Sequence, residues 1–159
     1  MKYLLAAAIL ALATPAAGLA GDKIDRLAPT EGAVLNLDEL EWFPDPSLPE
    51  GSMISLVAGN SGAAEVFMVY VKLPPNTVVP PQTHPYAENV AVLKGRVGNG
   101  HGETFDKSEG KMLGAGSTFV LPAGHAHFLW STDEVIALLT ATGPWSIAYV
   151  DPSDDPRNQ

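Results

Sequence analysis

Gln82, His84 and Glu88 are spaced as in a metal site in which an amide stands in place of one imidazole. All three lie in the stretch PPQTHPYAENVAVLKG, residues 80–95, where His84 follows Gln82 by two residues and Glu88 follows His84 by four. The chain contains no cysteine, which excludes disulfides, thiolate metal sites and cysteine nucleophiles. Any bound metal ion must therefore take nitrogen and oxygen donors from the four histidines and the carboxylates.

The local pattern predicts two neighbouring strands around these side chains. Residues two apart on a strand face the same way, so we expect Gln82 and His84 on one side of an extended segment. Pro85 keeps His84 extended and favours a turn after it. We expect the next strand to begin at Glu88, which returns a carboxylate beside the imidazole, and to end in a turn at Gly95.

A second stretch supplies another imidazole. In GAGSTFVLPAGHAHFLW, residues 114–130, an apolar run enters a turn at Pro122-x-Gly124 and leaves it through His127. A strand that passes through such a turn brings a histidine in from an antiparallel neighbour.

The elements that must position these residues are short strands. Val, Ile, Phe, Leu and Tyr are concentrated in short runs bounded by turn residues. After the first twenty residues no stretch keeps the apolar period of a surface helix. Runs that recur at intervals of about ten residues are typical of a β-sandwich or barrel. The expected strands are 33–37, 53–59, 64–73, 89–97, 117–124, 125–130, 135–142 and 145–150.

The chain is predicted to hold one folded domain behind a leader. Residues 1–20 have a lysine near the start, an apolar run and small residues around a proline, which is the layout of a secretory signal peptide and predicts an exported protein, periplasmic or secreted. An uncleaved core helix is the alternative for this stretch. We expect residues 21–52 to form an N-terminal arm with the first strand, 53–150 to form the barrel, and 151–159 to form a polar, frayed tail.

The two histidine-bearing stretches together resemble the two signature motifs of the cupin superfamily, whose members are small β-barrels with one metal ion inside. The first motif reads Gly, His-x-His, three residues, Glu, six residues, Gly. This chain keeps its spacing from residue 82 to Gly95 but has Gln82 at the first histidine and lacks the leading glycine. The second motif is matched at Gly116, Pro122, Gly124 and His127. The resemblance implies an all-β fold, the cupin double-stranded β-helix, a jelly-roll-like antiparallel barrel in a single domain.

The resemblance also implies a ligand set of His84, Glu88 and His127, with Gln82 at the position of the family's first histidine. Two neutral imidazoles and one carboxylate suffice for one divalent transition metal ion; Fe(II) is favoured, and Zn, Mn, Ni or Cu are alternatives. Gln82 would add either a weak carbonyl donor or a hydrogen bond to metal-bound water. In a metal-free cupin the same residues would form an interior polar network, at the cost of burying a carboxylate without a cation.

Dioxygenase-type chemistry on a small uncharged or aromatic molecule is the favoured function, with Glu88 also moving a proton. One alternative is a zinc-type isomerase or lyase acting on a sugar or hydroxy acid, because type I mannose-phosphate isomerases, which are also cupins, use a Gln, His, Glu, His set. The other is a small-ligand or metal-binding module without turnover. Aromatic residues lie on the expected strands; those that face inward would line an apolar pocket, and plain core packing is the alternative for each of them. They are Phe67, Tyr70, Phe119, Trp130, Trp145 and Tyr149.

The charge of the chain limits its partners. Its formal net charge is −9, and removal of residues 1–20 with Lys2 would make it −10. Such a field disfavours nucleic acid and anionic membranes, so we expect a small-molecule substrate or ligand and, from the resemblance, a homodimer. The two other histidines are not expected to be ligands. His125 lies in a turn and is expected to be exposed, and His101 is interpreted as a hairpin-loop residue.

Overall fold

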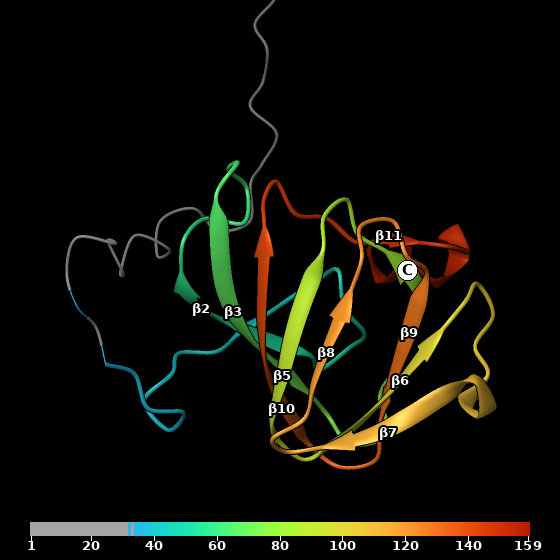
Figure 1. The fold of residues 1–159 in the computed structure, drawn as a ribbon, viewed down its shortest axis with the longest axis horizontal. Coiled ribbons are helices and arrows are strands. Elements are labelled where there is room, and N and C mark those ends of the chain that lie inside the picture. The colour runs from blue at the N-terminus through green and yellow to red at the C-terminus, as the bar shows by residue number, and fades with distance from the viewer. Residues whose placement is uncertain (1–31, 33) are drawn as a thin grey trace, which may run out of the picture.

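The computed structural model describes residues 32 and 34–159, which form two antiparallel sheets (Figure 1). The larger sheet has the order β1-β2-β3-β10-β5-β8, and the smaller has the order β11-β4-β9-β6-β7. The predicted all-β class is therefore confirmed. The strands are β1 (Phe43–Pro44), β2 (Met53–Ala58), β3 (Val66–Leu73), β4 (Val78–Thr83), β5 (Glu88–Lys94), β6 (Arg96–His101), β7 (Gly110–Gly114), β8 (Thr118–Leu121), β9 (His127–Ser131), β10 (Val135–Thr142) and β11 (Ala148–Tyr149). The 3-10 turns are η2 (Lys107–Glu109), η3 (Pro152–Asp154) and η4 (Pro156–Asn158).

The core lies between the inward faces of the two sheets. Leu139 of β10 and Val90 of β5 come from the larger sheet, whereas Val79 of β4 and Val97 of β6 come from the smaller, and all four belong to one buried cluster. Alternate residues of a strand point to opposite faces, so this cluster fixes which side chains of each strand face inward.

The turn expected at Gly95 separates β5 from β6. Gly95 has a φ of +76°, a conformation that only glycine adopts without strain. The strand before it begins at Glu88, as predicted. The expected strands at 53–59, 64–73, 117–124, 125–130 and 135–142 also correspond to strands of the structure.

The N-terminal part differs from the prediction. Residues 34–37 of the first expected strand form no strand, and the two-residue β1 at Phe43–Pro44 occupies the edge of the larger sheet instead. An edge position suits Pro44 because it has no N–H to donate to a second neighbour. The predicted signal peptide, residues 1–20, lies outside the described residues. Within the described part of the chain, no helix is long and apolar enough to cross a membrane.

The C-terminal part differs as well. The last expected strand, 145–150, shortens to β11, which leaves Trp145 on an irregular segment. The tail at 151–159 is not frayed, because Asp151 and Asp155 cap the turns η3 and η4 through their side chains. Arg157 then fastens the tail to the barrel by donating to the carbonyl of Ile147 at 2.9 Å.

Strand β7 was not predicted, and its first residue, Gly110, lies against Trp130 in an aromatic cluster on the outer face of the smaller sheet. Trp130 and Phe128 of β9 stack with ring centroids 6.0 Å apart, and Phe105 meets both rings edge-on. Gly98 and Gly100 of β6 lie beneath these rings, where an added Cβ would collide with Trp130 and Phe128 respectively. Glycine in β6 therefore makes the room that the aromatic rings fill.

Replacement of Gly98 tests this packing. We expect Gly98→Ala to destabilise the fold by about 1–3 kcal/mol, because the new methyl group overlaps the ring of Trp130. Gly114→Ala is the matched control, since Gly114 lies on the adjacent strand β7 with open space at its Cβ position. Urea unfolding of the two variants measures the difference. Equal free energies of unfolding for Gly98→Ala and Gly114→Ala would show that the absence of a side chain at Gly98 is not needed for the packing of Trp130.

Candidate metal centre

Three buried side chains, His84, Glu88 and His127, bring their polar ends together between the sheets. Glu88 is the first residue of β5, His127 is the first residue of β9, and His84 directly follows β4. His84 Nε2 lies 3.2 Å and His127 Nε2 lies 3.6 Å from Glu88 Oε2. One ligand atom from each residue lies within 4.8 Å of the others. The structure thus joins three of the residues that the sequence singled out.

Backbone carbonyls set the orientation of both imidazoles. His84 Nδ1 lies 3.0 Å from the carbonyl of Ser146, and His127 Nδ1 lies 3.1 Å from the carbonyl of His125. A carbonyl only accepts, so each Nδ1 must carry the proton and each Nε2 is left with a free lone pair. Metal-binding histidines are commonly oriented in this way, with one nitrogen donating to a carbonyl while the other faces the ion.

The resulting cluster is short of positive charge. His84 Nε2, Glu88 Oε2 and His127 Nε2 are all buried without a hydrogen-bond partner. Burial lowers the pKa of His127, although the nearby Glu88 carboxylate opposes that shift, so the imidazole is favoured in its neutral form. A neutral His127 leaves a lone pair facing the buried Glu88 carboxylate, which is unfavourable, and a divalent cation between them would remove that conflict. The donor set therefore fits a first-row metal ion.

Gln82 lies directly beside this cluster. It pairs with His127 across β4 and β9, and its side chain is buried with Oε1 unpartnered. The pairing of β4 with β9 is irregular between Val79 and Gln82. The strand reaches that point through Pro80 and Pro81, which cannot donate to the ladder. Gln82 thus presents an amide oxygen at the same buried locus as the two histidines.

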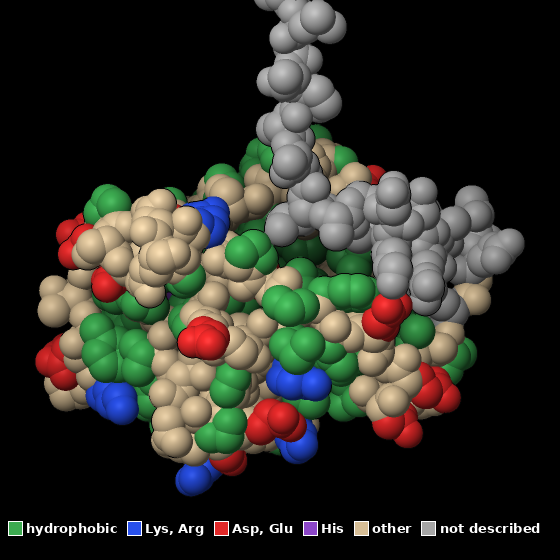
Figure 2. Space-filling view, turned by 180° about the vertical axis from the view of Figure 1, so that it is seen from behind, with side chains coloured by type: hydrophobic (Ala, Val, Ile, Leu, Met, Phe, Trp, Pro, Cys, Tyr) green, Lys and Arg blue, Asp and Glu red, His purple; other side chains and the backbone are tan. Residues whose placement is uncertain are grey.

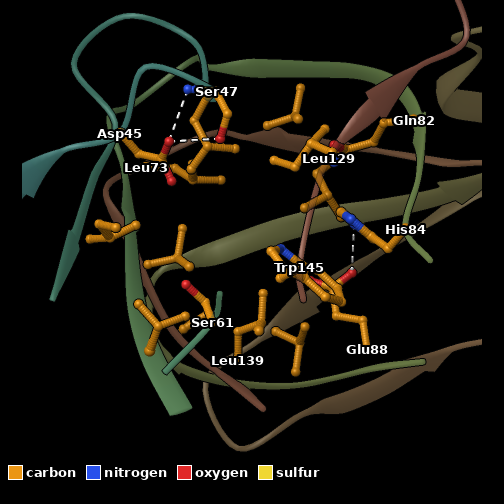
Figure 3. Close-up of a pocket in the computed structure, with 18 of the residues that line it drawn as sticks. Asp45, Ser47, Ser61, Leu73, Gln82, His84, Glu88, Leu129, Leu139 and Trp145 are labelled. Atoms are coloured by element: carbon orange, nitrogen blue, oxygen red, sulfur yellow. Dashed lines mark hydrogen bonds and ion pairs between the residues drawn. The ribbon is translucent and has the colours of Figure 1, made fainter. Parts of the chain in front are cut away.

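A cavity of about 330 Å³ opens from the cluster into the barrel. In Figure 3, Gln82, His84 and Glu88 lie along one side of the cavity, and Asp45 and Ser47 lie at the far end. The wall between them is apolar. It includes Leu48, Ile54, Leu56, Phe67, Val69, Val71, Leu73, Val79, Val90, Val97, Phe119, Leu129, Val135, Ala137, Leu139, Trp145 and Ile147. The site therefore combines one polar end with a pocket suited to an apolar molecule.

Trp145 connects the cavity to the metal ligands. Its ring stacks on His84 with centroids 4.1 Å apart and planes inclined by 20°, and it meets Phe67 edge-on. The backbone N–H of Trp145 donates to Ser61 at 2.7 Å, which holds the segment against the barrel. Because the next residue, Ser146, supplies the carbonyl for His84, this short segment holds that imidazole by both its face and its edge.

The arm around Ser47 and the C-terminal tail together close one end of the cavity. Tyr149 donates its hydroxyl to the carbonyl of Ser47 at 2.8 Å, and Asp45 accepts from the N–H and hydroxyl of Ser47. Burial raises the pKa of Tyr149, so its hydroxyl stays protonated. Arg157 lines the cavity from the tail and is paired with Asp155 through Nε and Nη2. The proline-rich arm thus packs on its own barrel.

The aromatic residues divide between the cavity and other positions. Phe67, Phe119 and Trp145 line the cavity, as expected, whereas Trp130 lies in the outer aromatic cluster and Tyr70 does not contribute to the wall. The residues that the sequence did not indicate at the site are Asp45, Ser47, Ser146 and Arg157. They lie far from the two motifs in the chain, and no motif spacing marks them.

The two remaining histidines lie near the cluster but on its solvent side. His125 is exposed, as predicted. His101 is also exposed, but it ends strand β6 and pairs with His127, so the interpretation as a loop residue was wrong. The buried Asn99, two residues before His101, has an unpartnered Oδ1 and was not singled out from the sequence.

Comparison with known proteins identifies sequence relatives. The family described as Cupin matches residues 61–143. Germin-like protein 3-1 from Oryza sativa subsp. japonica is 32% identical over 84 residues, which are 52% of this chain and 37% of that protein. Germin-like protein subfamily T member 2 from Arabidopsis thaliana is 40% identical over 70 residues, which are 43% of this chain and 32% of that protein. The chain spans about a third of the length of these curated relatives.

Solved structures share the fold. The polyketide cyclase RemF from Streptomyces resistomycificus superposes with a TM-score of 0.63 at 19% identity, over 80% of this chain and 92% of that one. A recombinant oxalate oxidase in complex with glycolate has a TM-score of 0.51 at 26% identity, over 67% of this chain and 59% of that one.

A substitution at Gln82 tests whether the amide lies within reach of a bound ion. We expect Gln82→His to tighten Zn(II) or Co(II) binding by roughly tenfold or more, because imidazole is a better donor than an amide oxygen for these ions. Gln82→Leu is the control, which keeps the bulk and removes the donor. Competition with a chelating dye measures the affinity. Unchanged affinity in both variants would place Gln82 out of reach.

The stacking of Trp145 on His84 provides an optical test of the centre. Co(II) bound by His84, Glu88 and His127 should quench the fluorescence of Trp145, which touches one ligand ring. Trp145→Phe should remove most of this quenching, whereas Trp130→Phe, in the outer cluster, should preserve it. Fluorescence titration with Co(II) gives the result. Quenching that survives in Trp145→Phe would locate the bound ion elsewhere.

Proposed function

The chain belongs to the cupin family, and on that premise we propose that it is a metal-dependent oxidoreductase of the dioxygenase type that acts on a small uncharged or aromatic molecule. The observation that carries the proposal is the buried cluster of His84, Glu88 and His127 at one end of an apolar cavity. The polar side chains at one end could hold a metal ion, and the apolar wall along the rest of the cavity could hold an apolar molecule beside that ion.

His84, Glu88 and His127 would hold the ion, with Gln82 beside them. When bound, a redox-active divalent ion such as Fe(II) supplies Lewis acidity and electrons for dioxygen chemistry. A site with three protein donors leaves coordination positions for small molecules. The likeness to an oxalate oxidase at 26% identity supports oxidation as the reaction class.

The protein's own groups would bind the substrate and move a proton. The apolar walls exclude water, and the ring of Trp145 offers a flat surface beside His84 for a planar molecule. Glu88 is the group we assign to proton transfer. The other carboxylate of the cavity, Asp45, is already engaged by Ser47, and the Tyr149 hydroxyl is protonated and bonded to the arm.

The charges around the cavity favour an uncharged substrate over a dianion such as oxalate. Among the residues that the structure describes, Arg157 is the one Lys or Arg side chain that lines the cavity, and it is already paired with Asp155. On the face of the molecule seen in Figure 2, Lys and Arg side chains lie scattered among acidic ones without forming a basic patch. A dianion would therefore find little to offset its charge apart from the metal ion itself.

Export from the cytoplasm is part of the proposal. It is supported by the leader-like composition of residues 1–20.

Oxygen uptake tests the proposed reaction. We expect the Fe(II)-loaded protein to consume dioxygen with members of a panel of phenols, aromatic ketones and other uncharged molecules, and not with oxalate. With iron supplied in excess, so that both proteins contain equal iron, Glu88→Gln should lower the rate of oxygen uptake by about 100-fold or more. Proton transfer by a side chain typically raises a reaction rate by about 10²–10⁴-fold. Tyr70→Phe, which alters a side chain outside the cavity wall, is the matched control.

The same assay separates the competing functions. Product formation without oxygen uptake would indicate an isomerase or lyase. Ligand-induced thermal stabilisation with no product under any condition would indicate a binding module. Either result contradicts the proposal.

A further inference from the structure

Two histidines outside the buried cluster lie in direct contact at the surface. His101 Nδ1 is 3.0 Å from His125 Nε2, and the ring centroids are 5.0 Å apart with planes inclined by 65°. Both residues are exposed, whereas His84 and His127 are buried. These four are all the histidines of the chain, and all lie in its described part.

The backbone holds this pair in place. His101 ends β6 and stands opposite His127 of β9, and His125 precedes His127 by two residues. The N–H of Gly102 donates to the carbonyl of Ala126 at 2.9 Å, which extends the ladder past the end of both strands. The distance between the two imidazoles is therefore set by strand pairing and not by two mobile loops.

We propose that His101 and His125 form a second metal site, at the surface, that takes Cu(II) or Ni(II). The two nitrogens share one hydrogen bond, so one of them carries the proton and the other accepts it. An ion would replace that proton and take a lone pair from each ring. Imidazole nitrogens suit Cu(II) and Ni(II), which stand high in the affinity order of divalent ions.

The pair uses atoms that the buried cluster does not. His101 would bind the ion through Nδ1 and His125 through Nε2. His125 orients His127 through its backbone carbonyl and not through its side chain. A side-chain substitution at residue 125 leaves that carbonyl in place. In the described part of the chain the one group of three potential metal ligands is the buried cluster, so solvent completes the coordination at the surface pair. The negative net charge of the chain favours the approach of a cation.

Immobilised-metal chromatography distinguishes this pair from the buried cluster. An ion held on a resin cannot reach His84 or His127, which are enclosed in the barrel, but it can reach an exposed pair. The full chain without an affinity tag is applied to Ni(II) and Cu(II) resins and eluted with an imidazole gradient. The variants are His101→Gln, His125→Gln and the double substitution, with folding checked by circular dichroism.

We expect the unsubstituted chain to be retained and both single variants to elute with the double variant, because loss of either imidazole removes the chelate. Failure of the unsubstituted chain to bind overturns the proposal without reference to any variant. Single variants that elute midway would show two independent histidines and would overturn it as well. The result does not depend on the reaction proposed above, since the double variant keeps the whole buried cluster.

Calorimetric titration with Cu(II) gives the matching measurement in solution. The unsubstituted chain should bind one equivalent more than the double variant. Equal stoichiometry in the two proteins would overturn the surface site, whether or not the buried cluster takes up the metal.

Discussion

The structure depends on the burial of Glu88 between two imidazoles that turn their lone pairs toward it. This arrangement opposes folding unless a cation compensates it, because three electron-rich atoms meet where water is excluded. Three strands and two carbonyls nevertheless hold the side chains in this geometry. The pairing of β5, β9 and β4 in the two sheets delivers the residues, and the carbonyls of Ser146 and His125 fix the tautomers. The free energy gained by pairing the strands therefore offsets the unfavourable contact of these three side chains, and a bound ion would stabilise the site further.

Two segments that flank strands β2 to β11 in the sequence, around Ser47 and around Arg157, close the far end of the cavity. The arm around Ser47 and the tail around Arg157 meet at the far end from Glu88, joined through the hydroxyl of Tyr149. The polar groups at the far end bond to one another, so under the proposed function the cavity suits a molecule with a reactive group near Glu88 and an apolar body. The family match covers residues 61–143, and the residues that close the far end of the cavity, Ser47, Tyr149 and Arg157, lie outside it. The far end of the cavity is therefore formed by segments that the family match does not cover, whereas most of the wall lies within the match.

The barrel and its ligands could be predicted because their signals are local. The spacing of Gln82, His84 and Glu88 and the Pro-x-Gly turn before His127 each encode a strand and a turn within a few residues. Residues that act over long separations could not be found this way. The carbonyl of Ser146 lies 62 positions from His84, and Ser47 lies 102 positions from Tyr149. Strand β7 and the outer aromatic cluster were also missed. Glycine weakens the sequence signal for a strand, and the glycines here leave space for aromatic rings of another strand.

Gln82 shows how the site tolerates the loss of its usual fourth donor. The residue pairs with His127 and is buried, and its amide oxygen has no hydrogen-bond partner. An amide oxygen is a weaker donor than imidazole, and it also carries an N–H₂ group that can donate to a neighbouring oxygen. The other two histidines do not depend on residue 82 for their orientation, since carbonyls from elsewhere hold them. An amide at residue 82 is therefore compatible with the observed positions of His84 and His127, and under the proposed function it would bind an ion more weakly than a histidine would.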